Sequence, residues 1–212
     1  MFIDFWNAIL TIGEQYFMKS LFINKSFNYI NKYKTLNELD KIKIKYGLEV
    51  MYYFVTKTII ILVMALIFNV FKEVLIFNLF YIPLRSLAHG FHAKNNLHCW
   101  IITLVSYIFI IIFIKYVTLD FKSLIIMDII AIISFIFWSP ADTKNLPLIH
   151  KKNRTKLKIL SLIFLTLEVI LSTMFLKYRN YISIAIILET ININPITYKI
   201  FRLKYNNYVE YS

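Results

Sequence analysis

The sequence predicts an all-α membrane protein, a polytopic bundle of about six transmembrane helices with an N-terminal amphipathic region. Of its 212 residues, 59% are hydrophobic and the mean hydropathy is +0.63, whereas soluble domains contain about 45–50% apolar residues. Glycine and proline are scarce, with three and four residues. Long apolar segments recur along the chain, and in lipid only helices and closed barrels satisfy every backbone hydrogen bond.

Three regions follow from the distribution of apolar and charged residues. Residues 1–24 place Phe2, Trp6, Ile9 and Phe17 at roughly helical spacing, which is typical of an amphipathic helix in the membrane interface. Residues 25–49 are rich in lysine and predict a solvated helix or helical hairpin, so residues 1–49 form an interfacial region. Residues 50–198 form the membrane domain, and residues 199–212 form a basic cytosolic tail.

Six apolar segments are expected within the membrane domain. A span needs about 20 residues, so several of these segments must include flanking positions. The second is the shortest and ends at Pro83, unless residues up to His89 complete it. The expected segments are Val50–Phe71, Val74–Leu84, Trp100–Ile114, Ser123–Trp138, Leu157–Leu176 and Tyr181–Asn194.

The basic residues indicate a partner and an orientation. The net charge of +12 would suggest nucleic acid for a soluble domain. Here the Lys and Arg residues flank apolar segments, which favours a bilayer with anionic headgroups and excludes nucleic acid. With a cytosolic N-terminus and six crossings, 19 of the 24 Lys and Arg residues lie in the cytosol and 5 outside. This arrangement places both termini and two loops, residues 85–99 and 139–158, on the cytosolic side.

The segment from Arg85 to Cys99 contains the only cysteine, three of the four histidines and one of the three glycines. A thiol attacks as thiolate, so catalysis needs a base or a positive environment. His92 is a candidate base, while Arg85, Lys94 and a helix N-terminus near Cys99 would supply positive charge.

Geometry requires the chain to turn between His92 and Cys99. On one unbroken helix the two residues would lie about 10 Å apart along the axis, too far for proton transfer at about 3 Å. We therefore expect a turn at residues 94–96, with Asn95 or Asn96 capping a helix that carries Cys99 in its first turn. Gly90 would allow a close backbone approach or a positive φ.

Other interpretations of these residues remain open. Cys99 fits a buried structural cysteine with ordinary interfacial histidines. His89, His92, His98 and Cys99 are all Zn²⁺-ligand types, although their spacing does not match the metalloprotease pattern.

A second loop and three acids carry further hypotheses. In Ser139–Pro147, Asp142 or Asn145 could orient His92 and Lys144 could bind a peptide carboxylate, or the segment is a plain turn with basic residues for lipid headgroups. Acidic residues inside apolar segments indicate polar contacts between helices or a transport pathway. These acids are Asp128, Glu168 and Glu189.

The motifs together resemble those of the accessory gene regulator B family of Firmicutes, membrane endopeptidases that process quorum-sensing peptides. The features are Arg85 seven residues before His92, the core Gly90-Phe-His92-Ala, and Cys99 seven residues after His92. Ser139-Pro-Ala-Asp142-Thr-Lys144-Asn145 resembles the second cytosolic loop of the family. One departure is His89 before Gly90, where the family often has a second glycine.

The resemblance implies a cysteine endopeptidase without cofactor or metal, in the plasma membrane of a Gram-positive bacterium. Cys99 would attack a short amphipathic propeptide, with His92 as base and then acid. The C-terminal tail of the propeptide would leave, and an internal cysteine or serine would displace the thioester to form a thiolactone or lactone. The sequence leaves open whether the protein forms a homodimer. The alternatives are a small membrane transporter or peptide exporter, and a non-catalytic membrane scaffold.

Overall fold

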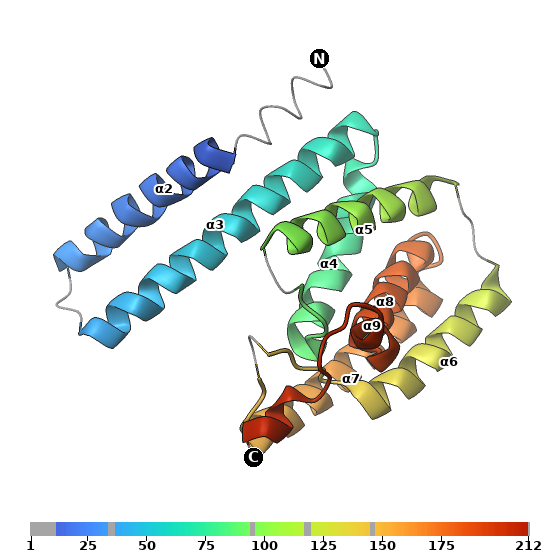
Figure 1. Cartoon of the computed structure of the whole chain (residues 1–212). Coiled ribbons are helices and arrows are strands. Elements are labelled where there is room, and N and C mark those ends of the chain that lie inside the picture. The colour runs from blue at the N-terminus through green and yellow to red at the C-terminus, as the bar shows by residue number, and fades with distance from the viewer. Residues whose placement is uncertain (1–11, 34–36, 94–95, 117–119, 145–146, 212) are drawn as a thin grey trace. The chain divides into compact units, whose positions relative to one another are not determined.

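The computed structural model describes residues 12–33, 37–93, 96–116, 120–144 and 147–211. Within these ranges all regular elements are helical, which confirms the predicted all-α class (Figure 1). The helices are α2 (Ile12–Tyr33), α3 (Glu38–Ile67), α4 (Phe71–Ala88), α5 (Asn96–Tyr116), α6 (Phe121–Trp138), α7 (Lys151–Met174), α8 (Arg179–Ile193), α9 (Pro195–Ile200) and the 3₁₀ helix η1 (Asn207–Tyr211).

The chain divides into two compact units, Met1–Val63 and Met64–Ser212. In the first unit α2 and α3 form a helical hairpin, in which Lys19 Nζ donates to Glu49 Oε1 at 2.9 Å. The expected amphipathic helix of residues 1–24 lies partly outside the described residues, and α2 continues past it to Tyr33. Helix α3 runs through residue 49 without interruption, so the lysine-rich segment and the first apolar segment share one helix.

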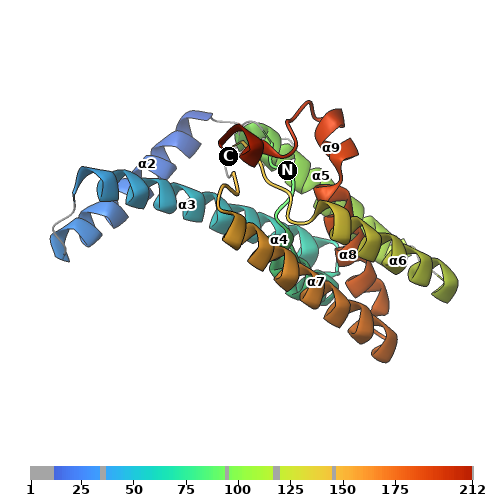
Figure 2. The ribbon, with the colours of Figure 1, turned by 90° about the horizontal axis from the view of Figure 1, so that it is seen from below.

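Helix α8 is the centre of the second unit. It packs on α4, α6 and α7, which lie around it in two perpendicular views (Figures 1 and 2). Apolar side chains from all four helices meet in the core, including Leu84, Phe135, Leu165 and Ile186. Because these helices share one core, the ends of α4, α6 and α8 are fixed close to one another.

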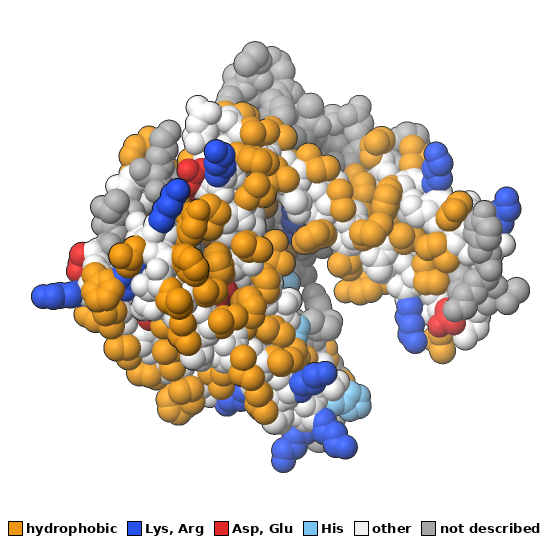
Figure 3. All heavy atoms as spheres, turned by 180° about the vertical axis from the view of Figure 1, so that it is seen from behind, with side chains coloured by type: hydrophobic (Ala, Val, Ile, Leu, Met, Phe, Trp, Pro, Cys, Tyr) orange, Lys and Arg blue, Asp and Glu red, His pale blue; other side chains and the backbone are white. Residues whose placement is uncertain are grey.

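The outward faces of the second unit are apolar. Helices α6 and α7 expose large hydrophobic side chains at helical spacing, and hydrophobic side chains cover much of the face seen in Figure 3. Such a surface is unfavourable in water and fits lipid. On α6 the exposed residues include Ile126, Ile130, Ile133 and Phe137, and on α7 they include Ile159, Ile163, Leu167 and Ile170.

In the part of the chain that the structure describes, three helices are long and apolar enough to cross a membrane, namely α3, α6 and α7. The other three expected spans coincide with α4, α5 and α8, which have 18, 21 and 15 residues. These three do not meet the same criteria among the described residues; in α5 the apolar part found is His98–Ile110. The count of six spans therefore stays a prediction.

Two expected boundaries differ from the structure. The expected segment Val50–Phe71 extends beyond the end of α3, which lies at Ile67. The chain turns at Asn69, whose φ of 56° asparagine tolerates better than most residues. Helix α7 begins at Lys151 instead of Leu157, because lysine is a good helix former and hydropathy detects only the apolar part of a helix. Helix α4 continues through Pro83 to Ala88, as the longer reading of that segment expected.

Candidate functional site

The chain reverses direction directly after α4, three residues before His92. His89 has φ 58° and ψ −122°, and Gly90 has φ +114°, which confirms the positive φ expected for this glycine. A Cβ on Gly90 would lie 2.2 Å from Nη1 of Arg85 and 3.0 Å from the carbonyl oxygen of Asn192. Both the backbone conformation and the lack of space therefore require glycine here.

Backbone hydrogen bonds attach this turn to two distant segments. The Gly90 N–H donates to the carbonyl of Ala141 at 2.9 Å, and the Ala141 N–H donates to Ala88 at 3.0 Å. The Phe91 N–H donates to the carbonyl of Asn192 at the end of α8, at 3.0 Å. The loop after α6 and the end of α8 thus fix the backbone that leads to His92.

Arg85 joins α4, the turn and α8. Its guanidinium donates to the carbonyl of His89 and, at 2.6 Å, to that of Phe91. It also forms an ion pair with Glu189, whose Oε1 lies 3.4 Å from Nη1. The sequence suggested Arg85 as a source of positive charge; the structure shows that it also holds the carbonyls of the turn.

Asn192 completes this network from α8. Its Nδ2 donates to Glu189 Oε2 at 3.2 Å and to the hydroxyl of Tyr81 at 3.0 Å. The side chain of Glu189 is fully buried and is satisfied by Arg85 and Asn192. The sequence predicted for Glu189 a contact between helices or a transport role, and it missed Asn192, because no local pattern connects α8 with a turn so far away in the chain.

His92 and Cys99 lie on either side of a break in the helical structure. His92 is exposed and follows the fixed turn, while α5 begins at Asn96 and holds the partly exposed thiol of Cys99 in its first turn. The predicted break and the position of Cys99 in the first turn are confirmed. The expected turn residue Lys94 and candidate cap Asn95 lie outside the described residues.

Asp142 anchors the C-terminal segment. Its side chain, 2% exposed as a residue, accepts hydrogen bonds from the backbone N–H groups of Asn207 at 2.8 Å and Tyr208 at 2.7 Å, and of Leu148 at 3.4 Å. The hydroxyl of Tyr198 donates to the carbonyl of Asp142 at 3.0 Å. The tail that the sequence described only as basic is thus tied to the second loop. An orienting contact from Asp142 to His92 stays a prediction.

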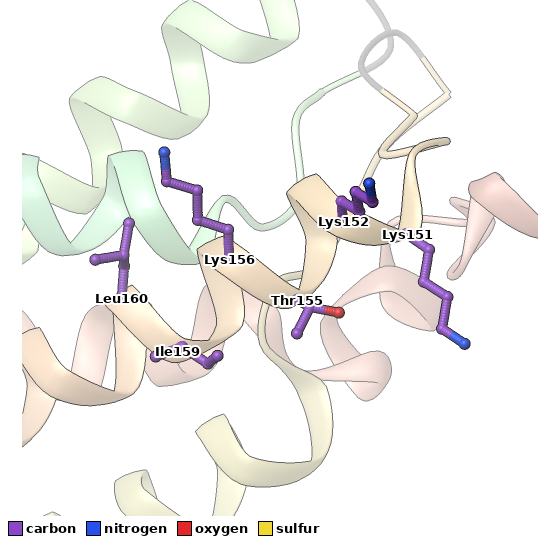
Figure 4. A pocket seen from close by; sticks show the side chains of 6 residues that line it. All are labelled: Lys151, Lys152, Thr155, Lys156, Ile159 and Leu160. Carbon is purple, nitrogen blue, oxygen red and sulfur yellow. The ribbon is translucent and has the colours of Figure 1, made fainter.

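The other predicted residues of the second loop are less constrained. Lys144 is exposed, and Asn145 lies outside the described residues. Further basic residues lie in the first turns of α7, where an open hollow combines lysine and apolar side chains (Figure 4). It is lined by Lys151, Lys152, Thr155, Lys156, Ile159 and Leu160.

The imidazole of His89 lies between opposite charges. Burial lowers its pKa below the ordinary value, the nearby guanidinium of Arg85 lowers it further, and Asp142 acts in the opposite direction. Burial and Arg85 therefore favour the neutral form of the imidazole. Within the described ranges, no group of three His, Cys, Asp or Glu side chains is arranged to hold a metal ion.

The acids of the apolar segments have different surroundings. Glu189 makes the interhelical contact that was expected of all three. Glu168 on α7 is equally buried, but neither of its carboxyl oxygens has a hydrogen-bond partner among the described residues. Asp128 on α6 is 4% exposed, and its Oδ1 likewise has no partner there.

Comparison with known families identifies the chain. The family model described as accessory gene regulator B matches residues 23–193. This range includes the turn at His89 and Gly90, Cys99, the second loop and α8. The chain belongs to the accessory gene regulator B family. Together with three apolar helices, this membership indicates a membrane protein of Gram-positive bacteria and is consistent with a part in quorum sensing.

Relatives resemble the chain over most of its length. A putative AgrB-like protein of Clostridium acetobutylicum is 29% identical over 86% of this chain and 88% of its own. A putative AgrB-like protein of Listeria innocua is 30% identical, covering 80% and 84%. The accessory gene regulator protein B of Staphylococcus aureus strain JH9 is 28% identical, covering 82% and 93%. No solved structure matches the chain.

Proposed function

We propose that the protein is a membrane-embedded cysteine endopeptidase that cleaves the C-terminal tail from a short autoinducer propeptide and promotes its cyclisation. One observation carries the proposal: the single thiol lies partly exposed in the first turn of α5, after a turn that α4, α8 and the second loop hold in place. The thiol has access to a substrate, and His92 precedes it on a fixed stretch of backbone. Membership of the accessory gene regulator B family supports the same reading.

The reaction begins with His92 removing the proton from the Cys99 thiol. The thiolate attacks the carbonyl carbon of the scissile peptide bond, the C–N bond breaks, and His92 returns the proton to the leaving amine. The propeptide remains on Cys99 as a thioester. A cysteine thiol or serine hydroxyl within the peptide then attacks the thioester carbonyl, which releases the Cys99 sulfur and closes a thiolactone or lactone ring.

The location of the site serves the second step. Water would hydrolyse the thioester and prevent ring closure, so a site at the bilayer boundary that limits water favours cyclisation. An amphipathic propeptide binds the same membrane surface through its apolar face. We place the site and both termini on the cytosolic side, where Lys144 binds a carboxylate of the peptide tail.

Substitution of the two central residues tests the proposal. Cys99→Ala and His92→Ala should each abolish propeptide cleavage in reconstituted vesicles, because the first removes the nucleophile and the second removes its base. His98→Ala is the matched control, since His98 is an exposed histidine of the same segment. Correct insertion is checked by protease protection of an epitope tag. Cleavage that persists in a correctly inserted Cys99→Ala protein contradicts the proposal.

A transporter or peptide exporter is the second candidate, and Glu168 is the observation that favours it. A buried carboxyl group without a partner is costly inside a membrane and often belongs to a transport pathway. This alternative predicts peptide flux in vesicles that survives Cys99→Ala and is lost in Glu168→Gln.

A further inference from the structure

Two glutamates on adjacent helices are equally buried but have different surroundings. Glu189 on α8 and Glu168 on α7 are both fully buried. Glu189 contacts Arg85 and Asn192, whereas neither oxygen of Glu168 has a partner among the described residues. Burying a carboxyl group in the bundle is unfavourable. The partners of Glu189 therefore indicate which part of the structure its side chain stabilises.

The contacts of Glu189 lead to the backbone before His92 by two routes. In the first, Glu189 pairs with the Arg85 guanidinium, which donates to the carbonyls of His89 and Phe91. In the second, Glu189 accepts from the side chain of Asn192, whose own carbonyl accepts the N–H of Phe91. Both routes end on Phe91, the residue directly before His92.

The turn has little freedom to move independently of this network. The hydrogen of Gly90 occupies the place where a Cβ would collide with the Arg85 guanidinium. A guanidinium released from Glu189 would be free to leave the two carbonyls, and two buried acceptors would lose their donor. The position of the His92 backbone is therefore coupled to the charge and hydrogen bonds of α8.

We propose that Glu189 and Asn192 are positioning residues, which act through Arg85 and the backbone of Phe91 to hold His92 in place for its task at Cys99. The proposal rests on the proposed function for the role of His92. The network of contacts among Glu189, Asn192, Arg85 and the backbone of residues 89–91, which we call the clamp, exists without substrate. Neither residue touches the reacting atoms. Their effect is on the fraction of molecules in which the imidazole is correctly placed.

Hydrogen exchange of the full-length protein in detergent tests the clamp without any substrate. Glu189→Gln should speed exchange of the Gly90 and Phe91 amides about tenfold, and Glu189→Ala should speed it more, because the amide of glutamine keeps part of the hydrogen bonding. Asn192→Ala should act in the same direction. Glu168→Gln is the matched control and should leave these amides unchanged, since it alters an equally buried carboxyl group whose oxygens have no hydrogen-bond partner among the described residues.

The pH dependence of Cys99 alkylation by iodoacetamide tests whether the clamp holds His92 in place for the thiol. If His92 is held for the thiol, Glu189→Gln should shift the alkylation profile toward alkaline pH, in the same direction as His92→Ala, while Glu168→Gln keeps the profile of the unchanged protein. Glu189→Asp should restore part of the shift. A merely structural loss of stability would affect both glutamate variants alike and would not move the profile.

The outcomes separate this proposal from the proposed function. Unchanged exchange at Gly90 and Phe91 in Glu189→Ala, or equal changes in Glu168→Gln, would overturn the clamp. An unchanged alkylation profile in Glu189→Gln, where His92→Ala does shift it, would overturn the positioning role. A profile that His92→Ala leaves unchanged, with cleavage retained in Cys99→Ala, would instead refute the proposed function, and the exchange experiment would still decide whether the clamp exists.

Discussion

The two halves of the segment Arg85–Cys99 are held in different ways. The half before His92 depends on distant residues: Ala141 from the second loop, and Glu189 and Asn192 from α8. The half with Cys99 is organised locally, because the helix that begins at Asn96 places the thiol in its first turn. The proposed general base therefore follows a stretch of backbone that the tertiary fold holds, whereas the proposed nucleophile lies in the first turn of a helix. Substitutions far from the motif in sequence should therefore act on the first half.

Gly90→Ala should disturb the half before His92 more than any other substitution. The new Cβ would collide with the Arg85 guanidinium and lie in tight contact with the carbonyl oxygen of Asn192, 3.0 Å away, and the positive φ is unfavourable for alanine. Cleavage should fall about 100-fold, the loss typical of a misplaced catalytic group, and the thermal midpoint in detergent should fall as well. Gly47→Ala is the control, since no neighbouring atom of the described residues lies within 4 Å of its Cβ position in α3. Equal activities of the two variants would contradict the account.

Asp142→Ala tests whether the second loop stabilises the turn at His89 and Gly90. Removing a carboxylate that accepts three backbone N–H groups should cost about 2–3 kcal/mol of local stability. Exchange of the Asn207 and Tyr208 amides should increase, and cleavage should fall about tenfold through the bond between Ala141 and Gly90.

Asp142→Asn sharpens the same comparison. Asparagine keeps one acceptor oxygen, so an anchoring role predicts a partial effect with an unchanged pH profile of cleavage. A displaced profile would mean that Asp142 acts on His92 as an orienting carboxylate instead.

Of these substitutions, that of His89 should have the smallest effect. Its pKa is lowered in the folded protein by burial and by Arg85, so below the ordinary histidine pKa of about 6.5 the unfolded chain takes up a proton that the folded chain resists. The stability should be highest above that pH and should decrease as the pH falls through it. His89→Gly should flatten this dependence between pH 7.5 and 5.5, and should raise the thermal midpoint by relieving a strained φ that costs about 1–3 kcal/mol. A pH dependence that persists unchanged in His89→Gly would assign it to another group.

The sequence could predict those features that depend on local patterns. Hydropathy identified the helical class and the apolar helices, and the Asn-rich stretch before Cys99 indicated where α5 begins. The turn at Asn69 was missed because the apolar residues on both sides form one continuous segment. The role of Arg85 at the turn and the anchoring of the C-terminal segment by Asp142 were also missed. Both arise from contacts between residues far apart in the chain, which no spacing within a motif encodes.

Trapping the acyl-enzyme tests the central claim most directly. The full-length protein in vesicles is incubated with a propeptide whose ring-closing cysteine or serine is replaced by alanine, so that ring closure cannot release it. The protein is then analysed by intact-mass spectrometry. The account predicts an added mass equal to the propeptide without its tail, located on Cys99 and removed by hydroxylamine. Tail release without any adduct on Cys99, or an adduct on another residue, would contradict it.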